Sequence, residues 1–291
     1  MKIKDYYAKQ KCTVSFEFFP PKTDEGELKL FEVARELKEL KPSFISVTYG
    51  ALGTTRSNTL RIVSKIKKEI GIEAAAHLTC VAHTRDEIEK VLADLQSSGI
   101  ENIVALRGDP PKGETEFKPV SNGFTHASEL VNFIRRHPTL SRAFSLAIAG
   151  YPEGHVECKD KDLDLKNLKH KVDQGADVVI TQLFFDNRKY FHFVERARKI
   201  GISIPIVPGI MPVTQGPQIQ KFAQMCGASI PDEMNQAIQK YGENQIAIEA
   251  YGIEFTTRQC RELIDGGVPG LHFYTLNKSN ATRQIYHNLF R

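Results

Sequence analysis

The sequence predicts an α/β fold, and specifically a (β/α)8 barrel of the TIM type. Short runs rich in β-branched residues alternate with amphipathic helical segments about eight times, as in a closed parallel sheet with helices outside it. Unusual polar residues recur at the ends of these runs, where barrels of this type place their active sites. No Gly-x-Gly-x-x-Gly follows any run, which weakens the competing prediction of an open, doubly wound sheet.

The expected elements follow one another regularly through residues 1–291, which we interpret as a single domain. Strands are predicted at 13–19, 44–49, 74–81, 102–106, 144–149, 178–183, 204–210 and 270–275. The helices that follow them are predicted at 24–41, 58–70, 84–98, 127–136, 162–174, 189–199, 218–225 and 281–289, with Asp24 as N-cap of the first. About sixty residues separate the last two strands, too many for a loop, so extra helices are expected at 231–241 and 245–266.

Composition limits the classes of function. The chain has 41% hydrophobic and 25% charged residues, which is typical of a soluble globular protein. Its 39 basic and 35 acidic residues are interspersed, so no basic stripe predicts nucleic-acid binding. The five cysteines are widely spaced and form no C-x-x-C pair, which favours a reduced protein. No apolar run is long enough for a signal sequence or a membrane span, and we expect a cytoplasmic protein.

The first predicted strand carries the acid of greatest interest. Alternation places Val14, Phe16 and Phe18 on one face, and Ser15, Glu17 and Phe19 on the other. Pro20 and Pro21 end the strand because neither can donate a ladder hydrogen bond. Nearby aromatic residues should raise the pKa of Glu17 by desolvation, so that it stays protonated near neutral pH and can donate a proton. A solvated Glu on an edge strand is the alternative.

Further polar residues stand where later strands are expected to end. They are Thr48, Tyr49, His77, Thr79, Arg107, Gly108, Asp109, Tyr151, His155, Gln182, Tyr274 and Thr275. Taken singly, His77 could be a hydrogen-bonded core histidine and Thr48 a simple strand former. In a barrel they would converge on one rim, where Gly108 would let a flat ligand approach the backbone. The sequence shows no metal-ligand spacing and no Gly-x-Ser-x-Gly elbow, so a bound organic cofactor is the expected source of the chemistry.

The helix expected after the fifth strand carries Asp164, Asn167, His170 and Lys171. The first three are three residues apart and can share a face. A solvated helical face is the ordinary interpretation. Near the barrel rim, the Asp and Asn could instead bind a ribose and the Lys a diphosphate.

Eight segments together resemble the methylenetetrahydrofolate reductases. They are V-S-F-E-F-F-P-P at 14–21, S-V-T-Y-G at 46–50, H-L-T-C at 77–80, A-L-R-G-D at 105–109, Y-P-E-G-H at 151–155, I-T-Q-L-F-F-D at 180–186, P-G-I-M-P at 208–212 and H-F-Y-T-L-N at 272–277. The resemblance runs from about Cys12 to the last helix. The chain length is similar to that of bacterial members, which lack the regulatory domain of eukaryotic ones.

The resemblance implies a flavoenzyme of one-carbon metabolism and methionine biosynthesis, which we expect to be a homo-oligomer. A tightly bound FAD would accept electrons from NADH or NADPH and then reduce 5,10-methylenetetrahydrofolate to 5-methyltetrahydrofolate by a ping-pong mechanism. Glu17 would protonate N10 of the folate, and Asp109 would stabilise the resulting cation. Substrate would be bound by Glu17, Thr48, Gln182 and Lys278. Contacts to FAD are implied for Thr48, Tyr49, Ala51, His77, Arg107, Gly108, Asp109, Ala127, Tyr151, His155, Asp164, Asn167, His170 and Lys171.

Three residues depart from the family pattern. His170 and Lys278 stand where arginines are expected, and Gly216 stands where an aromatic residue would stack on ligand. Two other functions stay open from the sequence. One is a different FAD-dependent barrel enzyme resembling proline dehydrogenase, and the other is a folate- or flavin-binding subunit that needs an electron-transfer partner.

Overall fold

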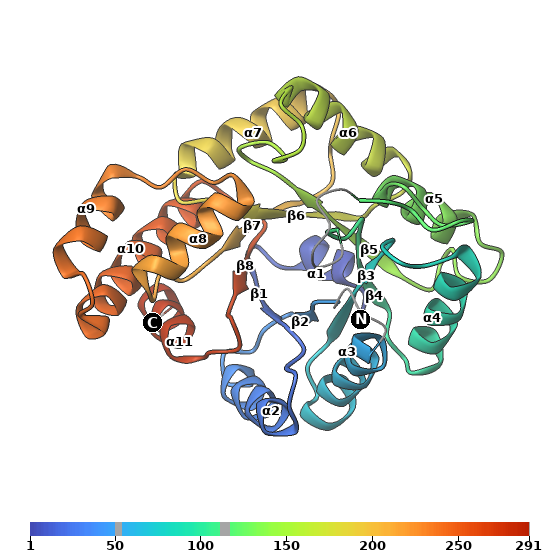
Figure 1. Cartoon of the computed structure of the whole chain (residues 1–291), viewed down its shortest axis with the longest axis horizontal. Helices are drawn as coiled ribbons and strands as arrows, with labels where there is room; N and C mark the ends of the chain where they lie inside the picture. Colours follow the sequence, from blue (N-terminus) through green and yellow to red (C-terminus); the bar gives the residue numbers. More distant parts are fainter. Residues whose placement is uncertain (50–53, 111–116, 291) are drawn as a thin grey trace.

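Eight parallel strands close into a barrel, as predicted. The computed structural model describes residues 1–49, 54–110 and 117–290. The strands are β1 (Thr13–Phe18), β2 (Phe44–Val47), β3 (Ala74–Thr79), β4 (Asn102–Leu106), β5 (Ser145–Gly150), β6 (Val178–Leu183), β7 (Ile206–Ile210) and β8 (Gly270–Tyr274). Each pairs in parallel with its neighbours in sequence, and β8 closes the ring onto β1 (Figure 1).

The helices form an outer ring around this barrel (Figure 1). They are α2 (Asp24–Lys38), α3 (Thr54–Lys65) with the π-helical turn η1 (Ile66–Ile70), α4 (Arg85–Ser97), α5 (Ala127–Arg136), α6 (Lys161–Asp173), α7 (Asn187–Lys199), α8 (Gly216–Cys226), α9 (Asp232–Tyr241), α10 (Gln245–Asp265) and α11 (Asn280–Phe290). Helices α9 and α10 lie between β7 and β8, which confirms the extra helices expected there. No described helix is both long and apolar enough to span a bilayer.

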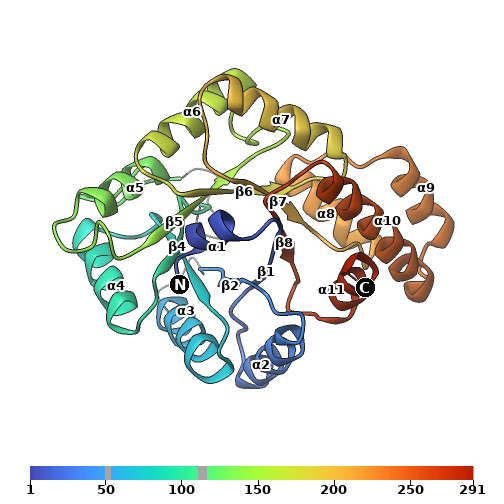
Figure 2. The same cartoon turned by 180° about the vertical axis from the view of Figure 1, so that it is seen from behind.

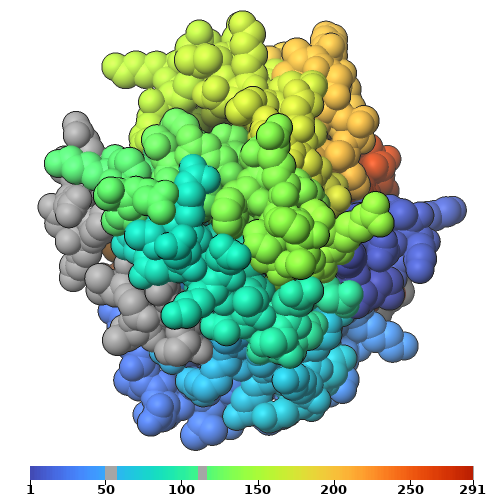
Figure 3. Space-filling model, turned by 90° about the vertical axis from the view of Figure 1, so that its right-hand side faces the viewer, coloured from blue at the N-terminus to red at the C-terminus, as the bar shows by residue number. Residues whose placement is uncertain are grey.

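An additional helix, α1 (Ile3–Lys9), was not predicted. Figure 2 shows it lying across the amino end of the barrel, and the space-filling view in Figure 3 shows the N-terminal residues at one edge of the face formed around α4 and α5. Ile3 is fully buried among interior residues that include Phe44 and Val207. Seven residues are too few for a stable isolated helix, so packing against the barrel floor stabilises α1.

Several predicted boundaries were wrong by a few residues. The N-cap of α2 is Thr23 rather than Asp24, because the Thr23 hydroxyl accepts a hydrogen bond from the Gly26 amide at 3.1 Å. Strand β2 ends at Val47 and β3 at Thr79, two residues before the predicted ends. The backbone therefore leaves the sheet just before or at the polar residues of the rim, where loops can position them.

The predicted alternation in β1 is confirmed. Phe16 and Phe18 face outward into the core between sheet and helices, whereas Glu17 faces the barrel interior. Parallel pairing places Glu17 opposite Ser46 and Tyr274. One layer deeper, Ser15 lies opposite Phe44 and His272. The interior thus has a polar layer at the carboxyl end, above a floor closed by α1.

Candidate active site

A cavity of about 560 Å³ lies over the carboxyl ends of the strands. It brings together ten of the predicted site residues, from β1 and from the segments that end or follow β2 to β6. They are Glu17, Thr48, Tyr49, His77, Arg107, Gly108, Asp109, Tyr151, His155 and Gln182. Apolar side chains including Leu106, Ile180 and Met211 complete the wall. A cavity that is mostly apolar with a few convergent polar groups is typical of a site for a flat organic ligand.

A second groove, of about 500 Å³, adjoins this cavity on the side of α5 and α6. It contains the remaining predicted cofactor residues of the described chain, which are Ala127, Asp164, Asn167, His170 and Lys171. The cavity and the groove share a wall formed by Leu106, Arg107, Ala149, Tyr151 and His155. A ligand with two linked parts could therefore occupy both.

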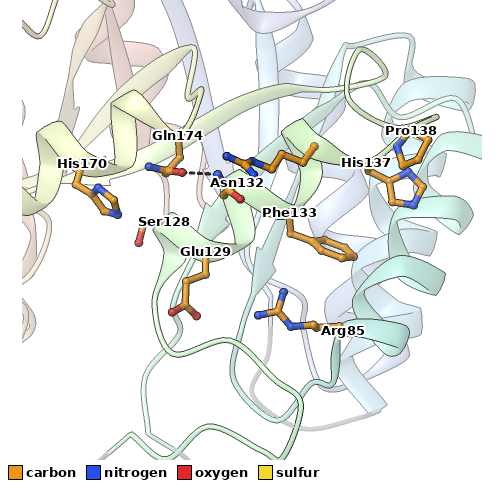
Figure 4. Close-up of a pocket in the computed structure, with 10 residues that line it drawn as sticks. Arg85, Ser128, Glu129, Asn132, Phe133, His137, Pro138, His170 and Gln174 are labelled. Atoms are coloured by element: carbon orange, nitrogen blue, oxygen red, sulfur yellow. Dashed lines mark hydrogen bonds between the residues drawn. The ribbon is translucent and has the colours of Figure 1, made fainter.

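A third hollow lies outside the groove, between α4, α5 and α6 (Figure 4). It shares Ser128, Glu129 and His170 with the groove. In Figure 4, His170 from α6 and Gln174, which caps this helix, lie on one side of the hollow, and Arg85 from α4 lies on the other. His170 thus stands at the outer end of the groove, where a bound diphosphate or nucleoside would approach solvent.

Three predicted residues are not part of the described cavity or groove. Ala51 falls outside the described residues. Lys278 lines a separate small hollow together with Thr275 and Leu276, rather than the central cavity. Gly216 is buried at the start of α8, where an added Cβ would lie 2.9 Å from Ile238. Gly216 does not line the central cavity, whereas Phe222 from the same helix does.

Glu17 is held by a polar network in the barrel interior. Its Oε2 lies 3.2 Å from Nε2 of His77 and 3.4 Å from Nε2 of His272. The Ser46 hydroxyl lies 3.4 Å from the same oxygen. The carboxylate therefore faces two imidazoles from β3 and β8.

This network corrects the expected protonation state of Glu17. Burial raises the pKa of its carboxyl, but the charge of His77 and the hydrogen bonds and charge of the two histidines outweigh burial and lower the pKa to about 2. The aromatic neighbours in sequence do not desolvate it, since Phe16 and Phe18 point outward. Glu17 by itself is therefore an ionised carboxylate near neutral pH.

Two buried polar atoms in the cavity wall fit a hydrogen-bonding ligand. Among the described residues, Oγ1 of Thr79 has no hydrogen-bond partner, and Nε2 of His77 has only its 3.2 Å contact with Glu17. Unpaired buried polar groups are costly, so a ligand that paired with them would be favoured. Beside them, Gly108 has φ +90°, and an added Cβ would lie 2.7 Å from Val81. A flat ring system such as an isoalloxazine fits these features.

The groove offers a positive group for an anionic ligand. The Lys171 ammonium donates to the Ala149 carbonyl at 2.7 Å, and burial lowers its pKa to about 8 although Asp164 opposes this shift. Asp164 accepts a hydrogen bond from the His155 amide at 3.2 Å, and burial raises the pKa of its carboxyl. A diphosphate beside Lys171 would stabilise the charged form of its ammonium group, which burial destabilises.

Arg107 has a partner that the sequence did not indicate. Its guanidinium donates two hydrogen bonds to Glu157, at 2.6 and 2.7 Å. Glu157 lies in the loop after β5 and lines the groove. This pair joins the end of β4 to that loop, at the boundary between cavity and groove.

The family model for methylenetetrahydrofolate reductase matches residues 2–290. The chain belongs to this family. It is 41% identical to the 5,10-methylenetetrahydrofolate reductases of Salmonella typhimurium and Escherichia coli, over 95% of this chain and 90% of each relative. It is also 40% identical to methylenetetrahydrofolate reductase (NADH) 1 of Arabidopsis thaliana, over 99% of this chain. The chain spans about half the length of that plant relative.

Solved structures share the fold at low sequence identity. An uncharacterised protein from Clostridium thermocellum, described as binding two copies of 5-methyl-5,6,7,8-tetrahydrofolic acid, superposes with a TM-score of 0.67 at 14% identity, covering 98% of this chain and 96% of that one. A 2,3-dimethylmalate lyase gives a TM-score of 0.57 at 9% identity, covering 98% of this chain and 82% of that one. At these identities the likeness shows the barrel fold alone.

The sequence did not predict three residues in or next to the candidate site. Phe222 sits within a helical pattern that gives no sign of facing a cavity. Glu157 carries no signal beyond its place two residues after His155. His272 stands in the H-F-Y-T-L-N segment, and its strand position two residues before Tyr274 predicts an inward side chain.

Proposed function

We propose that this chain reduces 5,10-methylenetetrahydrofolate to 5-methyltetrahydrofolate with electrons from NADH or NADPH, using bound FAD in a ping-pong mechanism. This proposal is carried by one observation: the central cavity adjoins the groove, and each contains residues suited to one part of the cofactor. Glu17, Asp109 and Gln182 surround the cavity, and Lys171, Asp164 and Asn167 line the groove that adjoins it. The proposed unit is one FAD-bearing barrel over residues 1–291.

FAD would supply hydride transfer when bound. Lys171 and His170 would face its diphosphate, Asp164 and Asn167 a ribose, and His77 and Thr48 the ring system. Gly108 would allow the ring to approach the backbone. Ala51, Tyr49, Arg107, Ala127, Tyr151 and His155 complete the proposed cofactor contacts.

The folate would occupy the remaining part of the cavity. Gln182 would hold the pterin, since its carbonyl accepts from the Leu183 amide at 2.8 Å and its amide nitrogen stays available to donate. Lys278 would meet the substrate beyond the cavity. Glu17 would deliver a proton to N10 as the five-membered ring opens, and Asp109, exposed at the rim, would stabilise positive charge that develops on the substrate.

The cellular setting is part of the same proposal. We infer a cytoplasmic homo-oligomer that acts in methionine biosynthesis and needs neither a membrane nor nucleic acid. The Arabidopsis relative is named for NADH, which makes NADH the first donor to test.

Anaerobic half-reactions test this function. The purified chain reconstituted with FAD should show flavin bleaching by NADH or NADPH, followed by reoxidation with 5,10-methylenetetrahydrofolate. Bleaching without reoxidation by the folate would favour another FAD-dependent barrel enzyme. No bleaching by either nucleotide, with folate still bound, would favour a subunit that receives electrons from a partner protein.

A further inference from the structure

His272 lies directly beneath Glu17 and outside the cavity lining. Its side chain is fully buried in the barrel interior, in the layer below Glu17. The cavity wall includes Tyr274 of the same strand but not His272. A ligand in the cavity can therefore interact with His272 only through another residue.

The orientation of the His272 ring is fixed on every side. Nδ1 lies 2.8 Å from the Ser15 hydroxyl, and Nε2 lies 3.4 Å from Oε2 of Glu17. The Phe44 ring stacks on it with centroids 5.8 Å apart, and Tyr274 meets it edge-on at 5.6 Å. Nε2 thus points at the carboxylate and cannot turn toward another partner without disrupting this packing.

His77 also approaches Glu17 but differs in two respects. Its Nε2 lies closer to Oε2 of Glu17, at 3.2 Å, and its side chain lines the cavity. A bound cofactor could therefore recruit His77. His272 does not line the cavity, so a ligand there does not contact it directly.

The proposed reaction consumes one proton per turnover, because a nitrogen of the substrate is protonated as its bond to carbon breaks. A carboxylate with a pKa of about 2 does not hold that proton near neutral pH. The His272 imidazole in contact with it has two ring nitrogens and can carry a proton on each. The proton would then be held on His272, in the layer beneath the Glu17 carboxylate that delivers it.

We propose that His272 is a positioning residue that holds the proton and passes it through Glu17 to the substrate. This inference rests on the proposed function. In the step, the Nε2–H bond of protonated His272 breaks and Oε2 of Glu17 gains the proton, while Glu17 gives a proton to the substrate nitrogen. His272 is left neutral and Glu17 ionised, and no electrons change hands between them. One proton from water restores His272 after the product leaves.

The other groups around this pair are uncharged or lie above it. Ser46 from β2 contacts both Glu17 and His272, at 3.4 Å each. Burial raises the pKa values of Tyr274 on β8 and Tyr7 on α1, so both hydroxyls stay neutral. Among the described residues the titratable neighbours of Glu17 and His272 are thus His77 and these two tyrosines.

Infrared spectroscopy tests the location of the proton without turnover. The difference spectrum between the wild type and Glu17→Gln at neutral pH should show the loss of a carboxylate band and no carboxylic-acid carbonyl band. An acid band assigned to Glu17 would overturn the proposal. The infrared measurement does not require an active enzyme. A failure of the folate reaction would therefore refute the proposed function without deciding where the proton is held.

A variant tests the role in catalysis. His272→Gln keeps an amide that can donate to Glu17 but cannot hold an additional proton. Reduction of the flavin by NADH should continue, whereas the folate half-reaction should slow by about 10²-fold, with its pH limb displaced to lower pH. An unchanged rate and pH limb would overturn the proposal, and so would an equal loss in both half-reactions. If this variant does not fold, the ¹⁵N resonances of His272 in the wild-type protein can be measured instead. A neutral His272 ring at neutral pH would also overturn the proposal.

Discussion

At the scale of single residues, the candidate site contains two buried charged groups whose pKa values are shifted from their usual ranges. Glu17 is ionised because His77 and His272 outweigh its desolvation, and Lys171 has a lowered pKa because burial outweighs Asp164. The first arrangement favours proton transfer. The second favours an anion, because a bound diphosphate would stabilise the charged form of Lys171.

The first prediction concerns Glu17. Glu17→Gln should leave reduction of the flavin by NADH within about twofold and slow the folate half-reaction by about 10²-fold or more, because the amide cannot transfer the proton. Stopped-flow absorbance of the two half-reactions measures both rates. A similar loss in both would contradict the role in proton transfer.

A second prediction concerns Lys171 and pH. FAD affinity should be constant below pH 8 and fall as pH rises above it, by at most about tenfold per unit, because the free protein loses the Lys171 proton near pH 8. In Lys171→Met the affinity at pH 7 should be lower and this fall absent. Fluorescence titration with FAD measures both curves.

Lys169→Met is the matched control for this change. Lys169 lies on the same helix, and its ammonium pairs with Asp173 on the surface. It should leave FAD affinity and its pH dependence unchanged. An equal effect of the two variants would indicate a general charge effect rather than a diphosphate contact.

At the scale of elements, strand ends and one short helix position the site. The Arg107–Glu157 pair joins the end of β4 to the loop after β5, and α1 closes the barrel floor beneath Ser15 and His272. Helix α1 gains its stability from burial of Ile3, whose amide also donates to the Asn102 side chain at 2.7 Å.

Truncation of Ile3 tests the role of α1. Ile3→Ala should lower the free energy of unfolding by about 2–5 kcal/mol, because a fully buried side chain leaves a cavity. Leu28→Ala, at a position 64% exposed on α2, should change it by less than about 0.5 kcal/mol. Urea denaturation measures both. A loss for Ile3→Ala no larger than the control would show that α1 does not close the barrel.

At the scale of the whole molecule, the cavity and the groove adjoin and share a wall, so a ligand in two parts could occupy both. The ring system would occupy the cavity over β1 to β8, and the nucleotide would occupy the groove against α5 and α6. Binding to the folded state alone raises stability by mass action.

This arrangement predicts different stabilisation by FAD and FMN. FAD at a hundred times its dissociation constant should raise the free energy of unfolding by about 2.7 kcal/mol. FMN at the same concentration should stabilise the chain less, because it lacks the adenosine half that would fill the groove. Thermal denaturation with each flavin measures the difference. Equal shifts would show that the groove does not contribute to binding.

The sequence by itself determined the barrel, its extra helices and most of the residues that meet in the site. Alternating strands and helices depend on local periodicity, and residues at the ends of parallel strands must converge when the sheet closes. Glu17, Gly108, Gln182 and Lys171 could therefore be predicted as neighbours of one site. Family motifs then assigned each a role.

Only the tertiary structure decided the state of Glu17, the closure of the floor by α1 and the place of Gly216. Glu17 and His272 are 255 residues apart in the chain, and their contact lowers a pKa that sequence neighbours alone suggested was raised. Phe222 enters the cavity while Gly216 of the same helix packs against Ile238. Electrostatic shifts and packing depend on distances in space, which local periodicity does not specify.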